Sequence, residues 1–223
     1  MSAGIRDISG WIYGGMWSYC PEYPGADIQE LPQPAFLPPD YPVYLQKFII
    51  GGQTGTYIET RAHVDPKAEP VTALPLSQFL RPAVVINVGE KGPGRVISVA
   101  DLEQAKPDIH PGDAVLLSTG WDKNWNEPYF IEGSPYIEHE AALWLIKREI
   151  GLLASDFPRF DNPSSMQFPW DAFWEHVNLL LAPVTNLDGL SGRCGMLAAF
   201  PLKIREACST PCRAALLLNK EDL

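Results

Sequence analysis

The chain has 223 residues, of which 46% are hydrophobic and 11% aromatic, enough apolar material for one large buried core. Its formal charge of −10 and pI near 4.8 argue against a nucleic-acid partner, because proteins that bind phosphate backbones usually present a basic face. No N-terminal basic and apolar segment or membrane-length apolar window is present. We therefore expect one domain over residues 1–223, a cytoplasmic location and no membrane partner.

The N-terminal part of the chain is rich in proline and aromatic residues. Residues 6–45 carry so many prolines that long helices are not expected there. A strand is predicted over 44–50 because this segment is mostly apolar. The aromatic side chains of the proline-rich part, Trp17 and Tyr19 among them, have one plain explanation, which is that they pack a surface loop.

The segment that follows gathers polar side chains. Gln53, Tyr57, Glu59 and His63 are all an even number of residues apart, so in a strand their side chains would leave the same face. Gly55 lies among them, and a glycine lets another backbone approach closely. This pattern suits a functional site, although a solvated polar strand face would look the same.

The middle of the chain alternates short apolar runs with amphipathic segments. Continuous apolar runs at 83–88, 114–118, 152–155 and 214–218 predict buried strands. Ser98 and Asp101 form a capping box, which predicts a helix over 99–105. A second helix is predicted over 138–149, since apolar residues recur at helical spacing and Gly151 follows. This order favours an α/β domain with a mixed, strand-rich sheet covered by helices.

A third helix is expected to begin after Asp171 as its N-cap. Phe173, His176, Val177 and Leu180 would then share one apolar stripe. A histidine in such a place is either a buried core residue or a ligand that points into a site.

Four cysteines are present, and only Cys208 and Cys212 are close in sequence. A zinc site would need two further soft ligands, and an intracellular chain without a regular cysteine framework is usually reduced. Four free thiols are expected.

The segment with the polar cluster resembles the signature of the putative-cyclase family of metal-dependent hydrolases, which includes bacterial kynurenine formamidase and isatin hydrolase. The signature reads His-x-Gly-Thr-His-x-Asp-x-Pro-x-His. Gly55, Thr56 and His63 keep it, whereas its other positions are changed. They are Gln53 and Tyr57 in place of two histidines, Glu59 in place of aspartate and Arg61 in place of proline.

The resemblance continues along most of the chain. Pro111-Gly112-Asp113 and Thr119-Gly120-Trp121 match family motifs, and the loop 156–161 matches an Asp-x-Pro-Ser-x-Asp loop that borders the family's site. The resemblance implies a swivelling β/β/α domain and a homo-oligomer, dimer or tetramer, with pockets near the subunit interface.

The resemblance also implies roles for individual residues. Metal ligands would be Gln53, Tyr57, Glu59 and His176, with Thr185 where the family has a downstream glutamate. His63 would transfer the proton, and Trp17, Tyr19 and Arg61 would contact the substrate.

Three functions remain open from the sequence. The first is hydrolysis of an amide, lactam or lactone bond of a small cyclic or aromatic substrate by way of a divalent metal. Oxygen donors such as Gln53, Tyr57 and Glu59 would hold Zn weakly and suit Mg, Ca or Mn better. The second is chemistry without a metal, with Glu59 and His63 as an acid/base pair in a hydrolase, cyclase or isomerase. The third is a scaffold that binds a small molecule without hydrolysing it.

Overall fold

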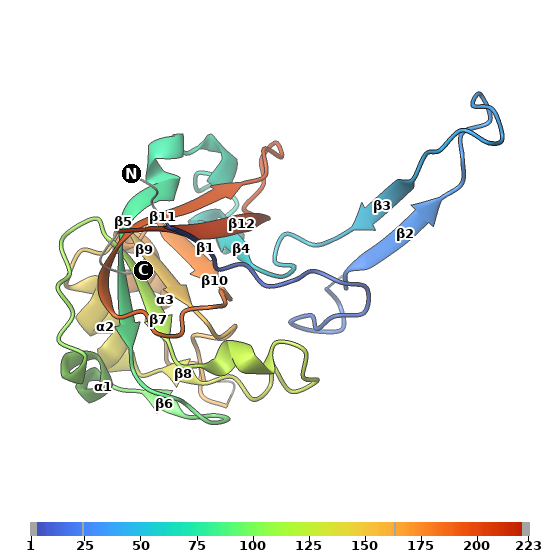
Figure 1. Cartoon of the computed structure of the whole chain (residues 1–223). Coiled ribbons are helices and arrows are strands. Elements are labelled where there is room, and N and C mark those ends of the chain that lie inside the picture. The colour runs from blue at the N-terminus through green and yellow to red at the C-terminus, as the bar shows by residue number, and fades with distance from the viewer. Residues whose placement is uncertain (1–3, 24, 163, 220–223) are drawn as a thin grey trace.

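The computed structural model describes residues 4–23, 25–162 and 164–219. Within these residues seven strands close into a mixed barrel (Figure 1) because β4 pairs with both β10 and β12. In order around the barrel they are β4 (Tyr57–Glu59), β12 (Ser209–Leu218), β11 (Gly192–Pro201), β5 (Leu80–Asn87), β7 (Ala114–Ser118), β9 (Leu152–Ser155) and β10 (Leu179–Ala182). The consecutive pairs from β5 to β10 are parallel, and β1 (Gly4–Asp7) joins β12 outside the ring.

β7, β9 and β10 are buried along their whole length, and β5 is buried over residues 83–86, which explains the uninterrupted apolar sequences of these strands. One set of alternating residues, including Val85, Leu116 and Leu181, fills the barrel interior. The other set, including Leu117 and Leu153, packs under the helices. The predicted α/β class with a mixed sheet covered by helices is confirmed, and the sheet is closed rather than open.

Three α-helices of the described chain lie on the outside of the barrel (Figure 1): α1 (Val99–Gln104), α2 (His139–Ile146) and α3 (Trp170–His176). The capping box at α1 is confirmed, since Ser98 Oγ accepts from the Asp101 N–H and Asp101 Oδ2 accepts from the Ser98 N–H. The predicted N-cap Asp171 is wrong. The carbonyl of Pro169 accepts the first helical hydrogen bond, from Phe173 N, so the helix begins earlier and Asp171 lies in its first turn. The helix ends at His176, so Leu180, expected on its apolar stripe, lies instead on a strand.

The shorter elements connect these layers. They are β6 (Val96–Ile97) paired with β8 (Tyr136–Ile137), and the 3₁₀ helices η1 (Arg61–His63), η2 (Val71–Ala73), η3 (Leu76–Phe79) and η4 (Trp121–Asn124). No helix in the described parts of the chain is long and apolar enough to cross a membrane. Cys20, Cys208 and Cys212 are free thiols, and the buried Cys194 donates a weak hydrogen bond to the Ala83 carbonyl.

A hairpin arm formed by β2 (Asp27–Leu31) and β3 (Leu45–Ile49) projects away from the barrel (Figure 1). The strand expected over 44–50 is therefore present, but it pairs with β2 and with none of the barrel strands. Large apolar side chains on this arm are exposed to solvent, Phe36 to 84% and Phe48 to 61%.

Candidate functional site

The site is centred on β4, the strand that closes the barrel. Ile58 points into the barrel core, so Tyr57 and Glu59 point to the outer face. Glu59 lies opposite Leu180 of β10 and Ser209 of β12. This register places a carboxyl group in the wall of the barrel with only 4% of the residue exposed.

Gly55 and Thr56 fix the approach to β4. Gly55 has φ +67°, and a Cβ there would lie 2.6 Å from Ile12 Cγ1, so the segment that comes close to this glycine is a side chain and not the backbone that was predicted. Thr56 Oγ1 accepts from Gly10 N at 2.9 Å and donates to the Pro183 carbonyl at 2.6 Å. Thr56 therefore ties the start of β4 to two distant loops.

Gln53 and His63 converge on Glu59. Gln53 Nε2 donates to Glu59 Oε2 at 2.8 Å and lies 3.4 Å from His63 Nε2. His63 Nδ1 is 4.0 Å from the same carboxylate oxygen. These residues meet as predicted, but not through a shared strand face. β4 covers only 57–59, so Gln53 reaches the carboxyl group from the preceding turn and His63 from η1.

Burial sets the protonation of the pair. It raises the pKa of Glu59 to about 7, and the Gln53 hydrogen bond opposes that rise. Burial lowers the pKa of His63 below its ordinary value of 6.5. At neutral pH the imidazole is therefore uncharged and the carboxyl group is divided between its two forms. Such a pair can accept one proton and donate another.

Two buried phenols lie beside the pair. The hydroxyl oxygens of Tyr19 and Tyr57 are 3.1 Å apart, and Tyr19 donates to the Pro158 carbonyl at 3.1 Å. Since a phenol has one proton, Tyr57 is the donor in the pair. Burial raises the pKa of both hydroxyls, so both are neutral.

These groups open onto a cavity of about 470 Å³ that is suited to a small molecule. Its walls combine polar groups with aromatic rings. They are formed by Tyr19, Gln53, Tyr57, Glu59, His63, Val64, Pro158, Arg159, Phe160, Asp161, Met166, Trp170, Asp171, Trp174 and Leu180.

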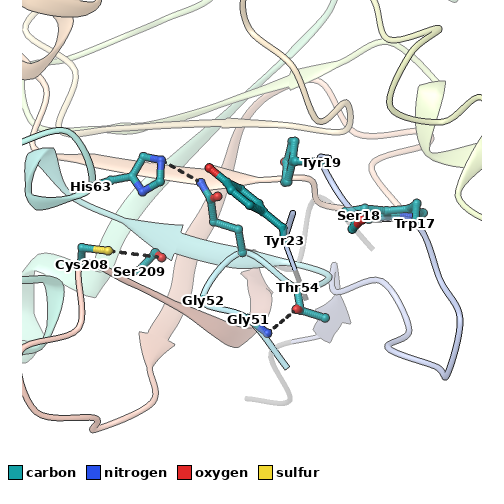
Figure 2. A pocket seen from close by; sticks show the side chains of 11 residues that line it. Trp17, Ser18, Tyr19, Tyr23, Gly51, Gly52, Thr54, His63, Cys208 and Ser209 are labelled. Atoms are coloured by element: carbon teal, nitrogen blue, oxygen red, sulfur yellow. Dashed lines mark hydrogen bonds between the residues drawn. The ribbon is translucent and has the colours of Figure 1, made fainter. Parts of the chain in front are cut away.

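A second cavity of about 300 Å³ shares Tyr19, Gln53 and His63 with the first. Figure 2 shows His63 and Cys208 on one side of it and Trp17 on the other. The Trp17 ring packs edge-on against Tyr19, with centroids 6.0 Å apart. The Gln53 and His63 pair is therefore reached from two cavities.

Three predicted site residues lie elsewhere. Arg61 is turned outward, with 53% of its side chain exposed, and its Nε is 3.6 Å from Asp65 Oδ2. Thr185 is part of the bridge to the N-terminal segment, its N–H bonding to the Ile8 carbonyl. Neither residue, nor His176, is among those that line the two cavities.

The exposed position of His176 differs from the predicted one, which pointed into the site. Helix α3 buries Phe173 and Trp174, and a residue two positions after Trp174 lies roughly 200° around the helix from it. His176 therefore faces solvent, and its Nδ1 lies 3.0 Å from the Ala172 carbonyl.

Several residues of the cavity wall were not predicted as site residues, Trp170, Trp174 and Arg159 among them. Trp170 and Trp174 lie four apart on α3, a spacing that puts them on one face. Arg159 stands in the 156–161 loop, where the family loop has serine. That loop was expected to border the site, so the arginine in it was the available signal.

Asp156, the first residue of the 156–161 loop, fixes that loop to Thr119 and Gly120. It accepts hydrogen bonds from Thr119 N, Thr119 Oγ1 and Gly120 N at 2.6–2.7 Å. Burial raises its pKa to about 7, although the three donors favour its ionised form. Asp156 does not line either cavity, so its contribution is to hold two loops together.

The side chains assembled here do not fit a zinc centre. Structural and catalytic zinc sites use three or four strong nitrogen, sulfur or carboxylate donors. Around Glu59 the described residues provide one imidazole, a carboxamide nitrogen aimed at the carboxylate and a neutral phenol. No group of three His, Cys, Asp or Glu side chains that could hold a metal occurs in the described chain.

Comparisons with known proteins agree with this fold. The sequence profile described as Putative cyclase matches residues 8–162. A kynurenine formamidase from Geobacillus thermodenitrificans is 31% identical over 164 residues, covering 73% of this chain and 75% of the relative. One from Salinibacter ruber is 27% identical over 180 residues, covering 78% and 80%.

Solved structures extend the likeness to almost the whole chain. An isatin hydrolase bound to the product analogue thioisatinate superposes with a TM-score of 0.81 at 22% identity, covering 97% of this chain and 92% of that one. A predicted metal-dependent hydrolase from Bacillus stearothermophilus gives 0.77 at 20% identity, covering 97% and 98%. The chain belongs to the putative cyclase family, and its kinship with these formamidases places it among the hydrolases of that family.

Proposed function

We propose that this protein hydrolyses an amide, lactam or lactone bond in a small aromatic or cyclic substrate, with Glu59 and His63 as its proton-transfer groups. The observation that carries the proposal is the buried Glu59 carboxyl group, with a pKa near 7, beside a neutral imidazole on the wall of an aromatic-lined cavity. Perturbed acid and base groups in a cavity are the usual mark of an active site. The kynurenine formamidases among its relatives support an amide as the bond cleaved.

In this reaction neutral His63 takes a proton from a water molecule as the water oxygen bonds to the substrate carbonyl carbon. The carbonyl π electrons move onto oxygen. When that oxygen re-forms the double bond, the bond to the leaving nitrogen or oxygen breaks, and protonated Glu59 supplies the proton to the leaving atom. The His63 proton then returns to the Glu59 carboxylate, which restores both groups. Such proton transfers contribute typically about 10²–10⁴-fold each.

Tyr57 is placed to stabilise the charge that develops on the carbonyl oxygen. It projects from the same face of β4 as Glu59 and keeps its proton because burial raises its pKa. Its O–H bonds to Tyr19 in the structure, so it serves this role after the O–H turns toward the substrate. Donors aimed at a developing oxyanion are often the largest single contribution to catalysis.

The experiment is a hydrolysis screen of aryl formamides, cyclic imides, lactams and lactones on chelator-treated protein. Turnover of at least one class, lost in both His63→Ala and Glu59→Gln but kept in His110→Ala and Glu175→Gln, is the expected result. The two control residues are exposed and lie outside the cavities. Ligand binding without turnover of any class would instead support a small-molecule-binding scaffold.

We also propose that the protein is a homo-oligomer in which the hairpin arm packs on a second copy. A two-stranded hairpin is at best marginally stable alone in water, yet this arm exposes Phe36, Tyr44 and Phe48. Burying such side chains contributes roughly 1.5–3 kcal/mol each. Size-exclusion chromatography with light scattering tests this: Phe36→Ser with Phe48→Ser should shift the protein to monomer, and an unchanged oligomer would contradict the proposed interface.

A further inference from the structure

Arg159 brings a positive charge to the larger cavity. Among the described residues that line this cavity, Arg159 is the only lysine or arginine, and His63 is neutral at pH 7. Burial raises the pKa of the Tyr19 hydroxyl, and the guanidinium is close enough for its charge to oppose that rise. A permanent cation thus stands within reach of the reacting groups.

The partners of Arg159 leave it available to a ligand. Its Nη2 donates to the Tyr19 carbonyl at 3.3 Å and to Glu132 Oε1 at 3.0 Å. The Glu132 side chain is 72% exposed, and an ion pair to such a group is worth little because water screens it. A bound anion can displace that pair at small cost.

The cavity wall also has unused hydrogen-bond donors. Arg159 Nε and Trp174 Nε1 are buried and have no acceptor among the described residues. A buried donor without a partner costs about 1–3 kcal/mol, so it calls for an explanation. A ligand that carries acceptor oxygens and lets these side chains settle around it would remove the cost.

The carboxylates of the wall do not cancel this charge. Asp161 is already engaged, because its oxygens accept from Gln167 N, Phe168 N and Trp170 Nε1. Asp171 is exposed at the start of α3. Glu59 hydrogen bonds to Gln53 and is partly protonated at neutral pH. Arg159 is therefore the charge that a ligand between these groups would meet.

We infer that Arg159 binds an anionic group, a carboxylate in the simplest case, on an aromatic substrate whose ring packs against Trp170 and Trp174. That the ligand is a substrate rests on the proposed hydrolysis, whereas binding of the anionic group to Arg159 does not depend on turnover. A guanidinium matches a carboxylate with two parallel hydrogen bonds, which lysine cannot reproduce.

The binding test uses benzoate and its neutral counterpart benzamide, followed by calorimetry and by tryptophan fluorescence at pH 7. Wild-type protein should bind benzoate more tightly than benzamide. Arg159→Gln should weaken the affinity for benzoate about 10- to 100-fold, the range expected for hydrogen bonds to a charged group. It should leave the affinity for benzamide unchanged. Arg205→Gln, which removes the same charge from an exposed loop, should change neither.

A second variant protects the test against a folding defect. Glu132→Gln removes the competing partner of Arg159 from an exposed position and should tighten benzoate binding a few-fold. Equal affinity of wild-type protein for benzoate and benzamide, or no loss in Arg159→Gln, would overturn the inference. An equal loss in Arg61→Gln would assign the anion to the outward-facing arginine instead, and would also overturn it.

The kinetic test separates this inference from the proposed function. N-formylanthranilate and formanilide share the aryl formamide bond, but only the first has a carboxylate. If both are hydrolysed, Arg159→Gln should raise KM for the first alone. If neither these two compounds nor any imide, lactam or lactone of the screen is hydrolysed while benzoate binding still depends on Arg159, the proposed hydrolysis fails and the anion site stands. If both are hydrolysed and Arg159→Gln affects them equally, the anion site fails and the hydrolysis stands.

Discussion

The side-chain amide of Gln53 donates to the buried carboxylate of Glu59 at 2.8 Å. This hydrogen bond stabilises the ionised form, whereas burial stabilises the neutral form and prevails. Gln53 occupies the position of a metal-binding histidine in the family signature, and in this chain its side chain lowers the pKa of Glu59 instead.

Gln53→Ala should raise the pKa of Glu59 above its value near 7, because the donor that favours the carboxylate is lost while burial remains. The alkaline limb of the pH–rate profile should move to higher pH. Gln104→Ala, a change on an exposed face of α1, is the control. A limb that stays in place would show that Gln53 does not tune the reacting acid.

His63→Ala should reduce turnover about 10²–10⁴-fold, the usual contribution of a positioned base. Thermal stability and benzoate binding should remain close to wild type. In wild-type protein the profile should be bell-shaped, with an acid limb below pH 6.5 from His63 and an alkaline limb near 7 from Glu59. A full rate in His63→Ala would remove His63 from the mechanism.

Glu59→Gln should stabilise the fold at alkaline pH. The pKa of Glu59 is raised from 4.5 to about 7 in the folded protein, so the unfolded chain ionises first as pH rises. The resulting loss of stability is absent below about pH 4.5, grows up to about pH 7 and reaches about 3 kcal/mol above that. Glutamine does not ionise and still accepts a hydrogen bond.

Urea unfolding at pH 5 and pH 8 measures this effect. The advantage of Glu59→Gln over wild type should be larger at pH 8, and exposed Glu175→Gln should show no such trend. An advantage that does not change with pH would mean that Glu59 ionises as easily in the fold as in water.

Asp156→Asn should destabilise the protein by about 2–4 kcal/mol, because an amide cannot accept from all three of the donors on Thr119 and Gly120 that the carboxylate satisfies. Chemical denaturation is the measurement. Asp40→Asn, on an exposed turn, should be neutral. A neutral Asp156→Asn would show that the two loops hold together without this residue.

Added Zn or Mn should not give this protein formamidase activity with N-formylkynurenine comparable to that of a relative with the full histidine signature. The reason is the donor set, in which Gln53 and Tyr57 stand where the signature has histidines. Turnover assays with and without metal, together with metal analysis of the purified protein, decide the matter. Metal-stimulated turnover at the relative's rate would contradict the conclusion drawn from these donors.

The sequence by itself determined several of the buried strands, the family, and the set Gln53, Tyr57, Glu59 and His63. Apolar runs such as 114–118 and 152–155 can be recognised locally because both of their faces are buried. The family signature can be recognised from Gly55, Thr56 and His63. A residue other than glycine would be strained at Gly55, because φ is positive there and the Ile12 side chain lies close.

Tertiary structure alone decided how those residues meet and what surrounds them. Parity along the chain could not show that β4 is only three residues long, or that Gln53 and His63 arrive from a turn and a 3₁₀ helix. Nor could it show that α3 buries Trp174 and turns His176 to solvent. Burial depends on contacts between distant segments, so the raised pKa of Glu59 and the place of Arg159 on the cavity wall follow from packing that no local pattern records.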